Sequence, residues 1–316
     1  MGKMIEGIWY TDDQKIASDG SFQRAVTTFR SKVAAGSPEG FEPEADRYHL
    51  YVSYACPWAH RTLIARALLG LEDVISFSNV DPIMLDDGWA FGGDGEEDPL
   101  HGASFLREIY LKADPKFTGR VTVPVLWDKK TQTIVSNESR EIMRMMVEGF
   151  RELSSTPDAL RRTDLDDVDV MLDSIYQPLN NGVYRAGFAQ KQGAYDKAVQ
   201  EVFATLDSLE ERLSTQRYLT GSVLSEADIA LFTTLIRFTP VYFSHFKCNL
   251  KRLEEYPSLW NFVLELYQNP NIGPTCNLKQ IKDHYYTSQP SVNPSRVIPL
   301  GPTLDLDRPH NRDRLR

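Results

Sequence analysis

Cys56 is the residue of this chain whose surroundings are best suited to chemistry. It follows residues 48–54, an aromatic and β-branched run that predicts a strand, and it precedes Pro57, which is favoured in the first turn of a helix. A cysteine at such a junction lies near the positive end of the helix dipole, where backbone N–H groups stabilise a thiolate. The alternative is a structural cysteine that behaves as a small hydrophobic residue. We favour a nucleophile, because strand–Cys–Pro–helix is more specific than a lone cysteine.

The residue three positions after Cys56 decides how such a thiolate would react. A second cysteine there would form an intramolecular disulfide, but the chain has Ala59. Cys56 must therefore form a mixed disulfide with an outside thiol and be released by another. Glutathione is the abundant candidate for both steps. Cys248 and Cys276 have no partner motif, so we expect them to be structural.

Glu138 and Ser139 open a helix at which a ligand could bind. Simple capping explains them, since Asn137, Glu138 and Ser139 are all favourable at a helix start. The same exposed N–H groups and the Ser139 hydroxyl could instead hold a γ-glutamyl carboxylate, while Glu138 takes its ammonium group. Beside a cysteine expected to react with glutathione, we favour binding.

The elements that position these residues follow the order of a thioredoxin-like domain. Strands are expected over residues 48–54, 74–80, 121–127 and 133–136, with helices over 58–69 and 137–150. Residues 81–119 interrupt this order as a long insertion rich in Asp, Gly and Pro. Loops of that length are functional or disordered, and the embedded aromatic residues favour an ordered one.

A proline interrupts the third expected strand. Pro124 cannot donate to a sheet, which by itself indicates an edge strand or a bulge. In thioredoxin-like domains the peptide bond before this proline is cis, and the preceding residue turns its backbone outward to pair with a peptide-like ligand. We therefore expect Val123 to bind the backbone of glutathione.

The fold class is α/β plus all-α, in two domains, as the length of 316 residues suggests. Apolar residues at spacings of three and four predict helices over residues 165–179, 195–214, 225–237 and 259–267. The expected regions are an N-terminal extension (1–46), a thioredoxin-like domain (47–156), an all-helical domain (157–288) and an extended tail (289–316).

Composition limits the possible partners. A net charge of −9 argues against a general nucleic-acid binder and against docking on anionic lipid. Three widely spaced cysteines indicate a reducing compartment, and the N-terminal residues lack the apolar core of a signal peptide. The sequence has no Cys/His cluster with zinc spacing and no apolar run near the roughly 20 residues that span a bilayer. We expect a soluble cytoplasmic protein with no metal and no nucleic-acid or membrane partner.

Five longer runs resemble the glutathionyl-hydroquinone reductases, the xi class of the omega-like glutathione transferases. The runs are residues 56–61, 87–91, 110–115, 119–128 and 136–139, and the likeness extends from about residue 5 to residue 290. The resemblance implies a thioredoxin-like domain followed by an all-helical glutathione-transferase C-terminal domain. It also implies glutathione as co-substrate and a homodimer.

By position, the resemblance implies a role for individual residues. Cys56 matches the nucleophile, and Tyr184 matches the proton donor. Tyr242 and Tyr285 match two tyrosines that lower the pKa of the cysteine, with Tyr286 as the alternative to Tyr285. Glutathione-binding residues are matched by Trp89, Arg120, Val121, Thr122, Val123, Glu138 and Ser139. The residues alone would not single out these tyrosines among fourteen, since most tyrosines pack amphipathically.

The implied reaction has two steps. The Cys56 thiolate attacks the sulfur of an S-glutathionyl-hydroquinone, hydroquinone leaves with a proton from Tyr184, and a second glutathione releases oxidised glutathione. Two alternatives remain: an omega-like thiol transferase or dehydroascorbate reductase, and a non-catalytic carrier of quinones or phenols. Ordinary conjugation is disfavoured, because a thiolate beside glutathione forms a disulfide more readily than it activates the glutathione thiol.

Overall fold

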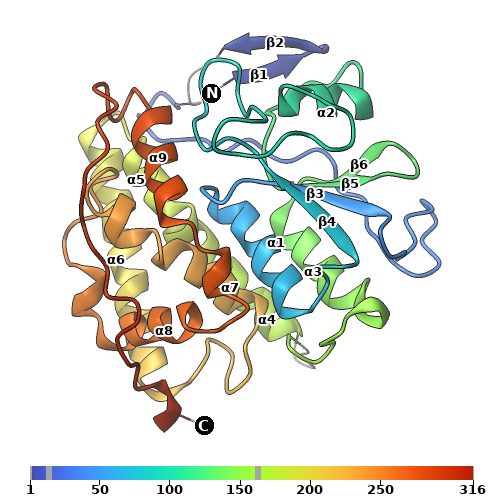
Figure 1. Cartoon of the computed structure of the whole chain (residues 1–316). Helices are drawn as coiled ribbons and strands as arrows, with labels where there is room; N and C mark the ends of the chain where they lie inside the picture. The colour runs from blue at the N-terminus through green and yellow to red at the C-terminus, as the bar shows by residue number, and fades with distance from the viewer. Residues whose placement is uncertain (1, 12–15, 161–164, 316) are drawn as a thin grey trace. The chain divides into compact units, whose positions relative to one another are not determined.

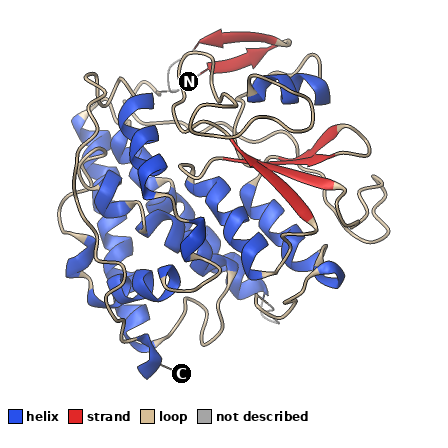
Figure 2. Cartoon of the chain, in the orientation of Figure 1, coloured by secondary structure: helices blue, strands red, loops and turns tan. Residues whose placement is uncertain are grey.

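The computed structural model describes residues 2–11, 16–160 and 165–315 of the chain (Figures 1 and 2). These residues form two compact units that interleave along the sequence. The first lies within Met1–Asp13, Ala25–Ala159 and Lys279–Ser288, and the second lies within Gln14–Arg24, Leu160–Leu278 and Gln289–Arg316. The domain boundaries predicted after residues 46, 156 and 288 stay a prediction.

A four-stranded mixed sheet forms the centre of the first unit (red in Figure 2). Its strands are β3 (Tyr48–Val52), β4 (Ile75–Asn79), β5 (Val125–Asp128) and β6 (Thr133–Ser136), in spatial order β4-β3-β5-β6. β3 runs parallel to β4 and antiparallel to β5, with Leu50 opposite Phe77 and Leu126. β5 begins later than expected, directly after Pro124, because proline has no N–H for the ladder.

Helices cover one face of this sheet, and less regular chain covers the other (Figure 1). α1 (Pro57–Leu68) and α3 (Ser139–Glu148) pack against each other on one side. On the opposite side lie α2 (Leu106–Ala113) and the antiparallel hairpin of β1 (Gly2–Ile5) and β2 (Ile8–Thr11). β3 is therefore buried along its whole length, as expected of a central strand.

The long insertion after β4 is ordered around one carboxylate. Asp98 accepts a hydrogen bond from the Tyr51 hydroxyl at 2.9 Å. It also accepts bonds at 3.1 Å from the backbone N–H groups of Leu100, His101 and Ala103. Because Tyr51 belongs to β3, these contacts fasten the insertion to the sheet.

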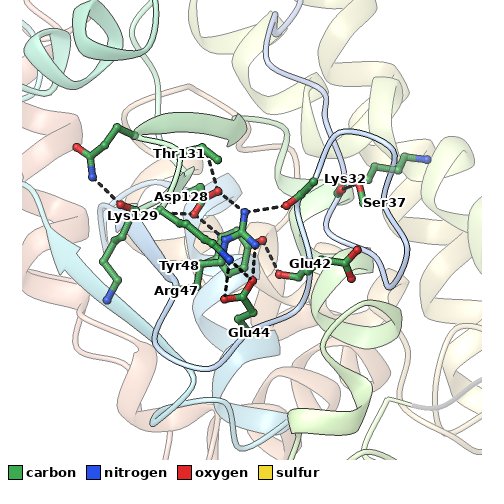
Figure 3. Close-up of polar contacts among 12 residues, drawn as sticks. Lys32, Ser37, Glu42, Glu44, Arg47, Tyr48, Asp128, Lys129 and Thr131 are labelled. Carbon is green, nitrogen blue, oxygen red and sulfur yellow. Dashed lines mark hydrogen bonds and ion pairs between the residues drawn. The ribbon is translucent and has the colours of Figure 1, made fainter.

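A buried ion pair joins Arg47, directly before β3, to Asp128 in the hairpin of β5 and β6 (Figure 3). Arg47 donates to the two carboxylate oxygens of Asp128 at 2.9 and 2.6 Å. The same guanidinium donates to Gly40 O at 2.9 Å and to Glu44 at 2.7 Å. Burial alone would raise the pKa of Asp128, but hydrogen bonds from Arg47 and Thr131 outweigh burial and hold this pKa below its ordinary value.

The extension is shared between the two units. In the first unit it pairs with the edge of the sheet: Ser31 N donates to Val135 O at 3.0 Å, and Arg30 pairs with Ser136 in an isolated antiparallel bridge. Residues 16–24 instead belong to the second unit.

Helices dominate the second unit. They are α4 (Leu165–Ile175), α5 (Gly182–Gly187), α6 (Gln192–Thr215), α7 (Glu226–Leu235) and α8 (Pro257–Tyr267), with short turns η2 (Tyr176–Asn180), η3 (Phe238–Tyr242), η4 (Leu253–Glu255), η5 (Gly273–Thr275) and η6 (Arg312–Arg314). The turn η1 (Arg151–Leu153) follows α3 in the first unit. The long α6 packs against α5 and α8. In the described part of the chain, no helix has both the length and the apolar character needed to cross a membrane.

The last long helix, α9 (Leu278–Ser288), packs in the first unit from Lys279 onward. Its Gln280 accepts from Asn79 Nδ2 at 3.2 Å and donates to Asp94 O at 2.7 Å. At the other end, Ser288 Oγ accepts from Met84 N at 2.9 Å. These contacts attach the helix that carries Tyr285 to the thioredoxin-like unit.

Candidate active site

Cys56 stands between β3 and α1. It is the N-cap residue of α1, with extended backbone angles (φ −78°, ψ 120°), and Pro57 follows in the first turn. The half-buried thiol donates to Val123 O at 3.7 Å. The helix N-terminus favours a thiolate, whereas the carbonyl of Val123 favours the protonated thiol.

A short turn presents Cys56. The backbone N–H of Cys56 donates to Ser53 O at 3.1 Å. Tyr54 N donates to Asn79 Oδ1 at 3.0 Å, which ties the turn to the end of β4. Because Asn79 also bonds to Gln280 of α9, the turn is held by two elements remote in sequence.

The run predicted to bind glutathione ends in a cis peptide bond between Val123 and Pro124, as expected from the sequence. Along the run, Val121 and Val123 are buried, whereas Arg120 and Thr122 are half-buried. At its start, Gly119 pairs with Met4 of β1 through hydrogen bonds of 2.8 and 3.0 Å. The N-terminal hairpin thus anchors the residue next to Arg120.

Tyr110 of α2 connects this run to the start of α3. Its hydroxyl donates to Thr122 O at 2.8 Å and accepts from Thr122 N at 3.2 Å. The same oxygen accepts from Asn137 Nδ2 at 3.1 Å, and Asn137 directly precedes Glu138. Burial raises the pKa of Tyr110, so the phenol stays protonated. One buried hydroxyl therefore sets the register of two predicted ligand-binding segments.

Glu138 caps α3, and the buried Ser139 begins it. One carboxylate oxygen of Glu138 accepts from Arg140 N at 3.3 Å. The other accepts from the hydroxyl of Thr27, in the N-terminal extension, at 3.2 Å. Capping and ligand binding use the same groups, so the geometry is compatible with both interpretations of these residues.

Arg30 braces the same turn of α3. Its guanidinium donates to both carboxylate oxygens of Glu141, at 2.7 and 2.5 Å. It also lies 3.5 Å from the hydroxyl of Thr27, which holds Glu138. Hydrogen bonding to Glu141 raises the pKa of Arg30. The extension therefore supports Glu138 directly and through its neighbour.

Trp89 is buried and stacks on His284 of α9, with ring centroids 4.9 Å apart and planes at 18°. His284 Nδ1 lies 2.8 Å from Pro82 O, so this nitrogen carries the proton and donates it. The next residue, Tyr285, packs edge-on against His284 at 5.3 Å. Tyr285 and Tyr286 are both buried, and burial does not choose between them.

Tyr184 and Tyr242 come together in the second unit. Tyr184 belongs to α5 and Tyr242 to η3, and their ring centroids lie 6.1 Å apart. Both rings pack against Phe246, with centroid distances of 5.4 Å for Tyr184 and 5.5 Å for Tyr242. Tyr184 is 8% exposed and Tyr242 is fully buried. Two of the three tyrosines that the resemblance picks out thus share one aromatic cluster.

The other two cysteines are poor nucleophiles. Burial raises the pKa of Cys248 and of Cys276 to about 12. This agrees with the structural role expected from the sequence. Across residues 2–11, 16–160 and 165–315, no three His, Cys, Asp or Glu side chains gather as metal ligands would.

Two family models match the chain. The model described as glutathione S-transferase, N-terminal domain, matches residues 55–148, and that for the C-terminal domain matches residues 192–264. The chain is 50% identical over 331 residues to the glutathionyl-hydroquinone reductase YqjG of Escherichia coli, with 99% of each chain covered. This chain belongs to the glutathionyl-hydroquinone reductases, the xi class of the glutathione transferases.

Further members of the xi class support this assignment. The glutathionyl-hydroquinone reductase PcpF of Sphingobium chlorophenolicum is 45% identical, with 97% of this chain and 98% of that protein covered. The solved structure of a xi-class transferase from Natrialba magadii is 50% identical and matches with a TM-score of 0.94, over 100% of this chain and 97% of that one. The predicted thioredoxin-like domain followed by an all-helical glutathione-transferase domain is confirmed, as is the resemblance.

Reasoning from the sequence missed several residues that support the xi-class site. Tyr110 stands in one of the five matching runs, and His284 stands beside Tyr285, so position offered a signal for both. Thr27 and Arg30 offered none, because their partners lie 111 residues away. The four residues contact predicted site residues or their neighbours rather than forming a separate site.

Proposed function

We propose that this chain reduces S-glutathionyl-hydroquinones to hydroquinones with glutathione, through Cys56. The observation that carries the proposal is the half-buried Cys56 thiol at the start of α1, on the carbonyl of Val123. A nucleophile is expected at this place in a chain 50% identical to a glutathionyl-hydroquinone reductase. Carrying ligands alone would not require it.

The proposed first step is attack of the Cys56 thiolate on the glutathionyl sulfur. The carbon–sulfur bond breaks, its electron pair stays with the ring carbon, and that carbon takes a proton from Tyr184. A Cys56–glutathione disulfide remains. In the second step, the thiolate of another glutathione attacks the glutathionyl sulfur of this disulfide, releasing oxidised glutathione and the Cys56 thiolate.

Glutathione suits the groups near Cys56. The N–H groups at the start of α3 and the Ser139 hydroxyl would hold its γ-glutamyl carboxylate, and Glu138 would hold its ammonium group. The backbone of Val123 would pair with the cysteinyl residue of glutathione. Trp89, Arg120, Val121 and Thr122 would complete the site. YqjG of Escherichia coli, a glutathione transferase homologue 48% identical to this chain, was solved with glutathione bound and matches with a TM-score of 0.87.

We assign Tyr242 and Tyr285 to stabilising the Cys56 thiolate. A phenol that donates a hydrogen bond to a thiolate favours the charged form. Tyr285 is supported by its place on α9, which is bonded to the end of β4. Replacing each tyrosine by phenylalanine should reduce the reaction of Cys56 with iodoacetamide at neutral pH. An unchanged rate in both variants contradicts this assignment.

The test is turnover of glutathionyl-menadione by the wild type, Cys56→Ala and, as a control, Cys276→Ala. We expect Cys56→Ala to lose at least about a thousand-fold in turnover, because the covalent step is removed. The control should keep most of it. Intact mass of wild type mixed with substrate should show one glutathione on Cys56. Full turnover by Cys56→Ala would contradict the proposal. No turnover by the wild type would favour a non-catalytic carrier of quinones or phenols.

A thiol-transferase activity is the second candidate, because a protein of Schizosaccharomyces pombe named glutathione S-transferase omega-like 2 is 45% identical over 92% of this chain. The same Cys56 would attack a disulfide or support reduction of dehydroascorbate. Comparing kcat/KM for glutathionyl-menadione, a glutathione mixed disulfide and dehydroascorbate separates the candidates. We expect the quinone conjugate to be the best substrate.

We also propose a homodimer in the cytoplasm. The dimer is supported by the resemblance, and the reducing compartment by three widely separated cysteines, none of which forms a disulfide. Light scattering after size exclusion should give twice the mass of 36.0 kDa. A monomer at micromolar concentration contradicts the dimer, and secretion of a tagged chain contradicts the location.

A further inference from the structure

Arg24, in the N-terminal extension, lies on the ring of Tyr184 in the second unit. Its guanidinium carbon is 4.7 Å from the Tyr184 ring centroid. We propose that Arg24 is a positioning residue that holds Tyr184 and stabilises the phenolate formed when Tyr184 gives up its proton. This inference rests on the proposed function, in which Tyr184 is the proton donor.

Arg24 is held in place by the segment that carries it. Residues 16–24 fold back on themselves, with Ala17 N donating to Ser21 O at 2.9 Å. Gly20 takes a left-handed conformation in this loop (φ +84°), which favours glycine. Its carbonyl accepts from Gln190 N at 3.0 Å, just beyond α5. Phe22 then packs on Phe188 at 5.3 Å.

A second contact joins Arg24 to the turn that begins α5. Arg24 Nε donates to Asn181 Oδ1 at 2.7 Å. Asn181 is the N-cap residue of α5, and its carbonyl accepts from Tyr184 N at 3.1 Å. Arg24 therefore touches both the ring of Tyr184 and the residue that starts its helix. Two contacts from a guanidinium fix orientation better than one point charge could.

Tyr184 is otherwise packed among aromatic rings. The ring centroids of Phe188, Tyr242 and Phe246 lie 6.2, 6.1 and 5.4 Å from the ring centroid of Tyr184. With 8% of Tyr184 exposed, little water can solvate a phenolate there. The Arg24 guanidinium is attracted to the face of the ring and is already in place, so it offsets this cost without reorganisation.

The proton that Tyr184 gives is needed for one type of leaving group only. When glutathionyl-menadione is cleaved, the ring carbon must take a proton as the carbon–sulfur bond breaks. When the disulfide of glutathione with 2-mercaptoethanol is cleaved, the leaving group departs as a thiolate and takes no proton from the enzyme. Cys56 is the nucleophile in both, so the ratio of the two activities reports on Tyr184.

The experiment compares Arg24→Met, Arg24→Lys, Tyr184→Phe and the double variant Arg24→Met/Tyr184→Phe on both substrates. Arg24→Met should lower the ratio of kcat for glutathionyl-menadione to kcat for the disulfide by about ten-fold, the size expected for a partly desolvated cation on a ring. Arg24→Lys should restore part of it. In the Tyr184→Phe background, Arg24→Met should change the ratio by less than about two-fold.

Arg185→Met is the matched control, because Arg185 lies on α5 and pairs with Glu201 instead. It should leave the ratio unchanged. The role of Arg24 is overturned if Arg24→Met lowers kcat equally on both substrates. It is also overturned if Arg24→Met lowers the ratio by the same ten-fold in the Tyr184→Phe background. Neither result contradicts the proposed function. A Tyr184→Phe variant with an unchanged ratio overturns the proton donor and this inference together, while Cys56→Ala still tests the reaction itself. If Arg24→Met does not fold, Arg24→Lys replaces it: a ratio below that of the wild type supports the role of Arg24, and an unchanged ratio overturns it.

Discussion

Replacing Tyr110 by phenylalanine should damage stability and glutathione binding together. The Tyr110 hydroxyl makes two hydrogen bonds with the backbone of Thr122 and one with Asn137, and it also lies 3.4 Å from the Thr122 hydroxyl. The first three are the shorter ones. Tyr110 is fully buried, so water cannot replace the lost oxygen. At about 1 kcal/mol for each bond, the variant should lose about 3 kcal/mol of the free energy of unfolding.

Tyr48→Phe is the matched control for this change. Tyr48 is also buried in the first unit, but its hydroxyl makes one bond, to Glu42 O at 2.7 Å, away from the site. It should lose about 1 kcal/mol. Urea unfolding measures both losses, and the extrapolation error of about 10–15% is smaller than the difference.

The second readout for Tyr110→Phe is the KM for glutathione. Thr122 and Asn137 adjoin Val123 and Glu138, so loss of their shared partner should raise KM about ten-fold, whereas Tyr48→Phe should leave it unchanged. The reasoning is refuted if Tyr110→Phe costs no more stability than Tyr48→Phe and leaves KM unchanged.

Four further changes test other parts of the structure. Arg47→Met removes the cation that pairs with the buried Asp128, and it should lower the free energy of unfolding in urea by about 3–5 kcal/mol. Lys129→Met breaks an exposed pair with Asp46 and should lower this free energy by less than about 1 kcal/mol. Equal losses in the two variants would contradict a buried pair. The pKa of Asp128 is lowered in the folded state, so its contribution to stability is complete above the ordinary value of 3.8 and is lost as pH falls through the lowered value. In Asp128→Asn, the free energy of unfolding should therefore depend less on pH in this acid range. The same dependence on pH as in the wild type would contradict the role of Asp128. Thr27→Val removes a hydrogen bond to Glu138 and should raise the glutathione KM about five-fold with kcat nearly unchanged; an equal fall in kcat would show that Thr27 acts elsewhere. His284→Ala removes the ring stacked on Trp89 and should likewise raise this KM, whereas His284→Phe should keep most of the affinity by preserving the stack; equal effects of the two would show that the bond to Pro82 matters more.

Local features of the sequence predicted much of the first unit. Pro57 after Cys56 indicated a helix start, and Pro124 indicated a break in a strand; the structure has α1 beginning at Pro57 and β5 beginning after Pro124. Asn137, Glu138 and Ser139 together indicated a helix start, and Glu138 is the N-cap of α3. Each of these predictions depends on backbone chemistry within a few residues, so the neighbouring sequence is enough to make it.

The supporting contacts could not be predicted in this way. Tyr110 was one of fourteen tyrosines until α2 placed its hydroxyl between Thr122 and Asn137. The sequence places residues 278–288 in the expected all-helical domain, and it gave no signal that Gln280 and Ser288 of α9 bond to Asn79 and Met84 of the first unit. Such pairings depend on how whole elements pack, and the hydrophobic pattern of a helix indicates which face is buried but not against what.

The sequence by itself determined the chemistry of this protein: one cysteine at a helix start, no second cysteine to resolve it, and the matching runs of a glutathione-dependent family. Tertiary structure alone decided which side chains contact the predicted site residues and their neighbours. Arg24 reaches Asn181 across 157 residues, and Thr27 reaches Glu138 across 111. The reason is physical: reactivity at a helix end follows from local backbone dipoles, whereas a cation on a ring or a hydroxyl on a carboxylate exists only after distant segments have packed.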